Sequence, residues 1–195
     1  MGYGDLHIDY ESHSNVRELL DCLTFVLEGI SLEFEKWDTR HVKGPGLYVA
    51  VVTGPTVAEF ADPMGNNHWP VSRCRTVCDG LDSFYETARD VARTRDGAVV
   101  VSVDDVLQRQ MVRFRDLKPD DSGPSTAEIA DYEDWMGARH MSALDTSARP
   151  NVVSTLTLSE ETGRVTVFQR GTFETYTRGE LGGEWNIETD GRLTT

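Results

Sequence analysis

The chain has 195 residues, of which 38% are hydrophobic and 27% are charged, a composition typical of a soluble globular protein that can bury a core. Its 33 acidic residues outnumber the 19 basic ones. The resulting net charge of -14 argues against binding a nucleic acid polymer, which needs a basic face. No stretch approaches the roughly 20 apolar residues of a membrane span, and the N-terminus lacks the features of a signal peptide. We therefore expect a cytoplasmic protein with no membrane span.

The basic residues are almost all arginine. Only Lys36, Lys43 and Lys118 are lysines. An acid-rich surface with little lysine suits high salt, where screening removes the self-repulsion of the negative charges. We therefore predict that the protein works in a halophilic cytoplasm.

The first 70 residues predict one helix, one strand and one loop. Apolar residues recur at three- and four-residue spacings over residues 15–36, the pattern of an amphipathic helix. This helix is expected to pack on the domain, a role as a partner or regulatory helix being the alternative. Residues 47–53 are apolar and rich in β-formers, which predicts a buried strand. Residues 61–70 are rich in turn formers and predict a loop, in which Trp69 is expected to cover the core rather than stack on a base.

The middle of the chain predicts a helix and a hairpin. Residues 83–95 carry an apolar side at helical spacing, and the valines at 99–101 are expected to form a central strand. Residues 106–114 alternate like a hairpin partner of that strand, with Asp104 and Asp105 at the turn. The polar stretch 116–125 contains two prolines and is expected to be an exposed loop.

The last part of the chain predicts a helix and three strands. The helix spans residues 134–146, and residues 151–158 and 164–169 form two strands joined by the turn Ser-Glu-Glu-Thr-Gly, in which Gly163 tolerates a positive φ. Residues 173–176 add another strand. The order of these elements predicts a mixed α/β fold, in which a mixed β-sheet is flanked by helices.

Three short stretches carry side chains suited to phosphate and metal chemistry. Asp96 precedes a glycine and a buried strand, and a carboxylate at the mouth of a sheet can bind a divalent cation. Arg139 presents a planar charged fork that suits phosphate oxygens, and His140 can donate a hydrogen bond to phosphate or ligate a metal. Glu160 and Glu161 supply two more carboxylates at another strand end. Active sites for phosphoryl or nucleotidyl transfer commonly combine carboxylates, a bound metal ion and an arginine.

Each of these stretches also has an ordinary interpretation. Asp96-Gly97-Ala98 is a common turn before a strand, Arg139-His140 is uninformative alone, and Ser-Glu-Glu-Thr-Gly fits any hairpin. Composition and spacing by themselves indicate a soluble α/β domain that could bind a nucleotide.

In combination, the three stretches resemble the signatures of the diadenylate cyclase family. That family has an Asp-Gly-Ala tripeptide, a Gly-Thr-Arg-His-Arg segment and a Ser-Glu-Glu-Thr-Gly turn, which here read DGAVVV, MGARHMSAL and LSEETGRVTVF. The resemblance covers about residues 46–171 and looks closest to the archaeal branch. It implies an N-terminal helical extension over residues 1–45, a diadenylate cyclase domain over residues 46–178 and a polar C-terminal tail over residues 179–195.

The resemblance implies an enzyme that joins two ATP molecules into cyclic di-AMP and releases two pyrophosphates, with Mn²⁺, Mg²⁺ or another divalent cation as cofactor. Each domain would hold one ATP, so two copies would face each other in a dimer. Asp96 and the metal, assisted by Glu161, would activate the ribose 3′-hydroxyl, while Arg139 and His140 would hold phosphates. The other substrate-binding residues that the motifs imply are Gly97, Ala98, Gly137, Ala138, Ser159, Glu160 and Thr162.

Two positions depart from the family pattern. Ala138 stands where the family commonly has threonine, and Met141 stands where it commonly has a second arginine, so one hydroxyl and one cationic contact are absent. Arg109 or Arg113 is a candidate for supplying the missing charge. A nucleotide-binding sensor without turnover is the main alternative to an enzyme, and a structural or interaction module with an acidic surface is the third hypothesis.

Overall fold

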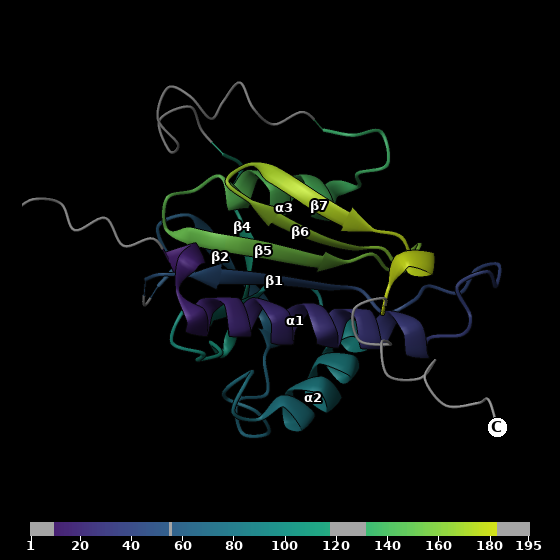
Figure 1. Cartoon of the computed structure of the whole chain (residues 1–195), viewed down its shortest axis with the longest axis horizontal. Helices are drawn as coiled ribbons and strands as arrows, with labels where there is room; N and C mark the ends of the chain where they lie inside the picture. Colours follow the sequence, from purple (N-terminus) through teal and green to yellow (C-terminus); the bar gives the residue numbers. More distant parts are fainter. Residues whose placement is uncertain (1–9, 55, 118–131, 183–195) are drawn as a thin grey trace, which may run out of the picture.

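A five-stranded mixed sheet forms the centre of the molecule in the computed structural model, which describes residues 10–54, 56–117 and 132–182 (Figure 1). Along the sheet the strands run in the order β3-β1-β5-β6-β7. Their bounds are β1 (Leu47–Val52), β3 (Val99–Ser102), β5 (Val152–Leu158), β6 (Val165–Gln169) and β7 (Thr172–Tyr176). β1 is parallel to β3 and antiparallel to β5, and the β5-β6 and β6-β7 pairs are antiparallel. The mixed α/β fold predicted from the sequence is confirmed.

A second, two-stranded antiparallel sheet lies beside β3. It pairs β2 (Ala61–His68) with β4 (Gln110–Phe114). Ala98, just before β3, exchanges backbone hydrogen bonds of 2.7 and 3.0 Å with Val112 of β4, so the small sheet continues the large one. The hairpin predicted between β3 and residues 106–114 is therefore present only as isolated bridges, because the ladder of β4 is made with β2.

The loop predicted for residues 61–70 is wrong, since residues 61–68 form β2. Pairing with β4 outweighs the weak β propensity of this segment. The register shifts between Pro63 and His68, which accommodates a proline and Gly65 within an irregular strand. Trp69 follows β2, is 1% exposed and packs 5.4 Å from the ring of Phe84, which confirms that it belongs to the core.

Three helices cover the two faces of the large sheet. α1 (Ser14–Glu33) and α2 (Leu81–Thr94) pack on one face and α3 (Ala138–Ser147) on the other (Figure 1). α1 shares its core with the sheet, which confirms the packing expected for the N-terminal helix. α3 begins four residues later than predicted because Gly137 has an extended ψ of 176° and serves as the N-cap.

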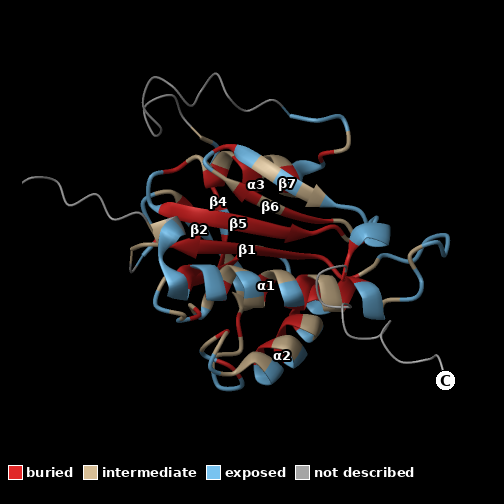
Figure 2. Ribbon diagram, in the orientation of Figure 1, coloured by how far each residue is buried: buried red, intermediate tan, exposed pale blue. Residues whose placement is uncertain are grey.

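β1 explains why the core has two halves. Leu47, Val49 and Val51 point to the side of α1 and α2, while the alternate residues Tyr48, Ala50 and Val52 point to the side of α3. All six are buried (Figure 2), as a fully apolar strand between two helical layers requires. β1 thus fixes the middle of the sheet and holds β3 and β5 on its two sides.

Parts of the sequence predictions fall outside the described residues. These are most of the loop at 116–125, Lys118 and the greater part of the tail at 179–195. Among the described helices, none is both long and apolar enough to cross a membrane.

Candidate functional site

A cavity of about 600 Å³ opens at one edge of the large sheet. Because β1 is parallel to β3 and antiparallel to β5, the start of β3 and the end of β5 lie at the same edge, on either side of Leu47. The N-terminal end of α3 reaches this edge from the second face of the sheet. The volume of the cavity falls within the range of pockets that hold a small organic ligand.

All the catalytic, metal-binding and substrate-binding residues that the resemblance implies line this one cavity, although up to 66 positions separate them in the chain. The topology thus brings together three stretches that no local pattern connects. They are Asp96, Gly97, Ala98, Gly137, Ala138, Arg139, His140, Ser159, Glu160, Glu161 and Thr162.

Asp96 stands at the mouth of the cavity, with 71% of its side chain exposed. The N–H of Gly97 donates a 2.8 Å hydrogen bond to Oδ1 of Asp96, which orients the carboxylate. Gly97 has a φ of +98°, and a Cβ there would lie 2.7 Å from Cγ of Met64. Glycine is therefore needed at this position, and the group that approaches its backbone closely is Met64, which also lines the cavity.

Arg139 lies between two carboxylates. Its Nη2 is 3.9 Å from Oδ1 of Asp96 and 3.8 Å from Oε2 of Glu160, both too long for direct hydrogen bonds. Gly46 permits this position, because a Cβ there would collide with the guanidinium. Glu160 is held in turn by Lys43, whose Nζ lies 3.1 Å from Oε1. The loose pairing leaves the N–H groups of Arg139 able to bind an anionic ligand.

His140 is buried, with 7% of its surface exposed, and its Nε2 has no hydrogen-bond partner among the described residues. Burial, with the charges of Arg139 and Arg164, lowers its pKa to about 4. The imidazole is therefore neutral at pH 7. Trp135 meets it edge to face at 5.2 Å. A buried ring nitrogen without a partner costs about 1–3 kcal/mol, a cost that a ligand's hydrogen bond would offset.

The turn between β5 and β6 is ordered by its own polar groups. The hydroxyl of Ser159 accepts hydrogen bonds from the backbone N–H groups of Glu161 (3.3 Å) and Thr162 (3.4 Å), while its own proton stays available for a ligand. Gly163 has a φ of +69°, which confirms the positive φ predicted for it. Its carbonyl accepts a 2.6 Å hydrogen bond from the hydroxyl of Ser31, so α1 anchors this turn directly.

The N-terminal end of α3 adds backbone donors to the cavity. Gly137 is the N-cap and offers no side-chain cap, and the first intrahelical bond shown is that from the N–H of Met141 to the carbonyl of Gly137. The preceding N–H groups of Ala138, Arg139 and His140 lack intrahelical acceptors, as at any helix start. Together with the helix dipole they favour an anion here.

Sequence reasoning missed two cavity residues that belong together. The guanidinium carbon of Arg164 lies 4.4 Å from the ring centre of Trp135, a cation–π contact. Arg164 directly follows the Ser-Glu-Glu-Thr-Gly turn, so reading the motif one residue further would have found it. Of the two arginines considered as substitutes, Arg113 lines the cavity and Arg109 is not among the described residues that do.

The carboxylates of the cavity do not form a complete metal cage. Among the residues that the structure describes, no three His, Cys, Asp or Glu side chains gather closely enough to hold an ion. Asp96 and Glu161, the ligands implied by the resemblance, both line the cavity. The donor set fits a cation bound by one or two carboxylates and completed by water and phosphate oxygens, which is the usual arrangement for Mg²⁺ with a nucleotide.

Comparison with known proteins finds similarity in structure alone. No protein-family profile matches the sequence, and no curated protein matches it. A solved structure described as a hypothetical membrane spanning protein from Bacillus cereus has a TM-score of 0.51 and 16% identity to this chain, and the match covers 81% of this chain and 63% of that one. A double mutant of DacA from Staphylococcus aureus has a TM-score of 0.47 and 12% identity, over 86% of this chain and 92% of that one. The chain thus spans less than two thirds of the Bacillus cereus protein, with which it shares the fold.

Proposed function

We propose that the chain is a diadenylate cyclase, which joins two ATP molecules into cyclic di-AMP and releases two pyrophosphates. The observation that carries this proposal is the convergence of the three motif stretches on one cavity. Side chains scattered from Asp96 to Thr162 would have no reason to meet there if each stretch were only a turn between strands. We also propose that the chain belongs to the archaeal branch of the diadenylate cyclase family and works in a halophilic cytoplasm. Its cyclase domain would span residues 46–178.

The residues divide into those that hold phosphates and those that face the reacting hydroxyl. Arg139, the neutral imidazole of His140 and the amides at the start of α3 bind phosphate oxygens and offset charge that develops at the α-phosphate. Asp96, oriented by Gly97 at the open mouth, faces the ribose 3′-hydroxyl of its own ATP. That hydroxyl loses its proton and attacks the α-phosphorus of the second ATP, so that a phosphodiester bond forms while the bond between the α- and β-phosphates breaks and pyrophosphate leaves. The reciprocal attack by the 3′-hydroxyl of the second ATP closes the ring and releases the second pyrophosphate.

Asp96 and Glu161 would hold a divalent cation, Mn²⁺ or Mg²⁺, on the protein side. When bound there it would polarise the phosphates and lower the pKa of the attacking hydroxyl. We propose that it enters with ATP, since the described carboxylates do not form a closed cage.

Two copies of the chain form the reacting unit. One cavity of about 600 Å³ suits one nucleotide, so the second ATP is held by a facing copy. Alignment of two bound reactants can lower a barrier by about 7–11 kcal/mol, which a single copy could not supply. Activity per chain should therefore rise with protein concentration until the dimer is saturated.

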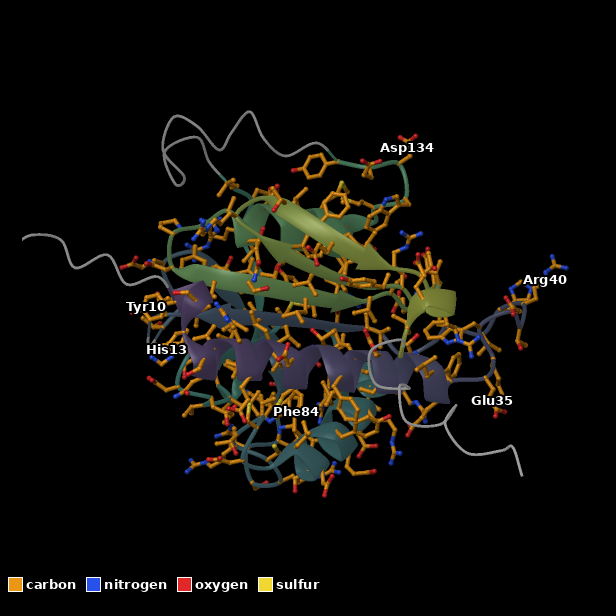
Figure 3. The ribbon with its side chains drawn as sticks, in the orientation of Figure 1. Tyr10, His13, Glu35, Arg40, Phe84 and Asp134 are labelled. Atoms are coloured by element: carbon orange, nitrogen blue, oxygen red, sulfur yellow. The ribbon has the colours of Figure 1, made fainter. Side chains whose placement is uncertain are left out.

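The direct test incubates the full chain with ATP and Mn²⁺, at low and at molar salt, and detects cyclic di-AMP by mass spectrometry. Asp96→Asn and Arg139→Ala should each lower the rate by about 100-fold or more, because each removes a charge that faces the reacting groups. Asp38→Asn and Arg40→Ala are matched controls, since both side chains are exposed, neither is among the described residues that line the cavity, and Arg40 projects outward from the molecule (Figure 3). A dimer that binds ATP with Mn²⁺ but yields no cyclic dinucleotide would sink the proposal.

A nucleotide sensor without turnover is the second candidate. It is favoured by Met141, whose side chain packs against the apolar cluster under α3 instead of supplying a cation, and by the absence of a hydroxyl at Ala138. A sensor would bind ATP or cyclic di-AMP with an affinity that Asp96→Asn leaves unchanged. Product formation by the wild-type chain would exclude it.

A further inference from the structure

Arg164 occupies an unusual place among the charges of the cavity. It lines the cavity from the end of the β5-β6 turn, and its guanidinium lies on the face of Trp135 rather than against a carboxylate. The backbone also fixes the position, since the carbonyl of Arg164 accepts a 2.9 Å hydrogen bond from the N–H of Ser159. The aromatic contact restrains the side chain without occupying its N–H donors.

The charge of Arg164 is not consumed by an ion pair. Within the described part of the chain, no carboxylate lies within 4 Å of its guanidinium, whereas Arg139 is flanked by Asp96 and Glu160. Glu180 is an acid that interacts electrostatically with Arg164, and its carboxylate already accepts hydrogen bonds from the N–H (2.8 Å) and hydroxyl (2.6 Å) of Thr177. Arg164 therefore keeps a full positive charge and an open set of donors inside the cavity.

On the opposite side of the cavity, α3 contributes Arg139 but no second cation. Met141 lies in the first turn of α3, and its side chain packs with the cluster that contains Ala143 and Leu144. The cavity is also lined by four carboxylates, those of Asp96, Asp116, Glu160 and Glu161, against three arginines, Arg113, Arg139 and Arg164. A triphosphate that binds there therefore depends on each of these positive charges.

We infer that Arg164, held on the ring of Trp135, is the second phosphate-binding cation of the cavity and takes over the charge that Met141 does not provide. The ligand class is a polyphosphate, either free or as the triphosphate of a nucleotide. The inference rests on the proposed function for the identity of the nucleotide, while the binding of a polyphosphate by Arg164 can be tested without turnover.

The experiment measures binding of tripolyphosphate, ATP and adenosine to the full chain by isothermal titration calorimetry, in the presence of Mg²⁺. Arg164→Gln removes the charge, Arg164→Lys keeps a charge without the planar fork, and Arg40→Gln is the matched exposed control. Arg164→Gln should weaken tripolyphosphate and ATP by about tenfold to a hundredfold, the range expected for a lost charge-assisted hydrogen bond, and leave adenosine unchanged. Arg164→Lys should fall between the wild type and Arg164→Gln.

Adenosine separates a phosphate contact from a general distortion of the site. Equal tripolyphosphate binding by wild type and Arg164→Gln would overturn the inference, and so would an equal loss of adenosine and ATP affinity. If Arg164→Gln lowers the melting temperature, Arg164→Lys keeps the test valid because it retains the aliphatic stem over Trp135. Loss of tripolyphosphate binding in Arg164→Gln, with no cyclic di-AMP made by the wild type, would support the role of Arg164 and reject the cyclase.

Discussion

Gly163→Ala tests whether α1 controls the turn that carries Ser159, Glu160 and Glu161. Two costs add at this position. An alanine here must adopt the left-handed backbone conformation at φ +69°, which costs about 1–2 kcal/mol. Its Cβ would also lie 2.7 Å from Oγ of Ser31 and 2.8 Å from Cε2 of Trp37, so a packed segment must move, at about 1–3 kcal/mol. Alanine also restricts the unfolded chain, which then loses less conformational entropy on folding, and this offsets about 0.4–1 kcal/mol of the two costs.

The expected net loss in the free energy of unfolding is therefore about 1–4.5 kcal/mol. Gly65→Ala is the matched control, because Gly65 has a φ of +53° with no atom within 4 Å of its would-be Cβ, so only the left-handed strain applies. Gly65→Ala should lose about 0–1.5 kcal/mol. Urea denaturation followed by circular dichroism measures both, with an unchanged m-value as the sign that the unfolded state is comparable.

Ser31→Ala separates the crowding from the hydrogen bond at the same place. Alone it should cost about 1–2 kcal/mol, because the carbonyl of Gly163 loses a buried 2.6 Å hydrogen bond. Combined with Gly163→Ala it should cost less than the sum of the two single changes, since removing Oγ relieves part of the collision. Equal losses for Gly163→Ala and Gly65→Ala, or strict additivity with Ser31→Ala, would refute the reasoning that α1 anchors this turn.

Two further predictions concern one buried and one partly buried polar side chain. The pKa of His140 is lowered to about 4 in the fold, against about 6.5 in the unfolded chain. The stability that its neutral form contributes is therefore present above pH 6.5 and lost as the pH falls through 4, with about 2 kcal/mol gone at pH 5. Urea midpoints measured against pH should show a shallower pH dependence for His140→Gln than for the wild type. Asp105 has a φ of +66°, and its carboxylate accepts hydrogen bonds from the N–H groups of Val77 (2.8 Å) and Cys78 (3.1 Å). Asp105→Ala should therefore lower the free energy of unfolding by about 2–4 kcal/mol. Asp104→Ala, at the exposed neighbouring position, is the control and should alter it by less than about 0.5 kcal/mol. A stable Asp105→Ala protein, or a His140→Gln protein with the wild-type pH dependence, would contradict the corresponding argument.

The segments that sequence patterns located well are those whose structure follows from their own residues. The apolar stripe of α1 and the continuous apolar run of β1 each predict an element within a few residues of its observed bounds. The turn at Gly163 has the same origin, because a positive φ is a local property of a glycine. β2 is the counterexample, since its proline and glycine predict a loop and only the edge offered by β4 makes it a strand.

By itself, the sequence determined the order of the helices and strands other than β2, the mixed α/β class and the three stretches that carry charged and small residues, because periodicity and motif order are properties of neighbouring residues. Only the tertiary structure decided that those stretches share one cavity, that Arg139 lies between Asp96 and Glu160, and that Met141 turns to the core while Arg164 lies on Trp135. The pKa of His140 was likewise decided by the fold, through burial and the charges around it. These features depend on distances between residues far apart in the chain, and such distances exist only after the sheet has placed β3 and β5 on either side of β1.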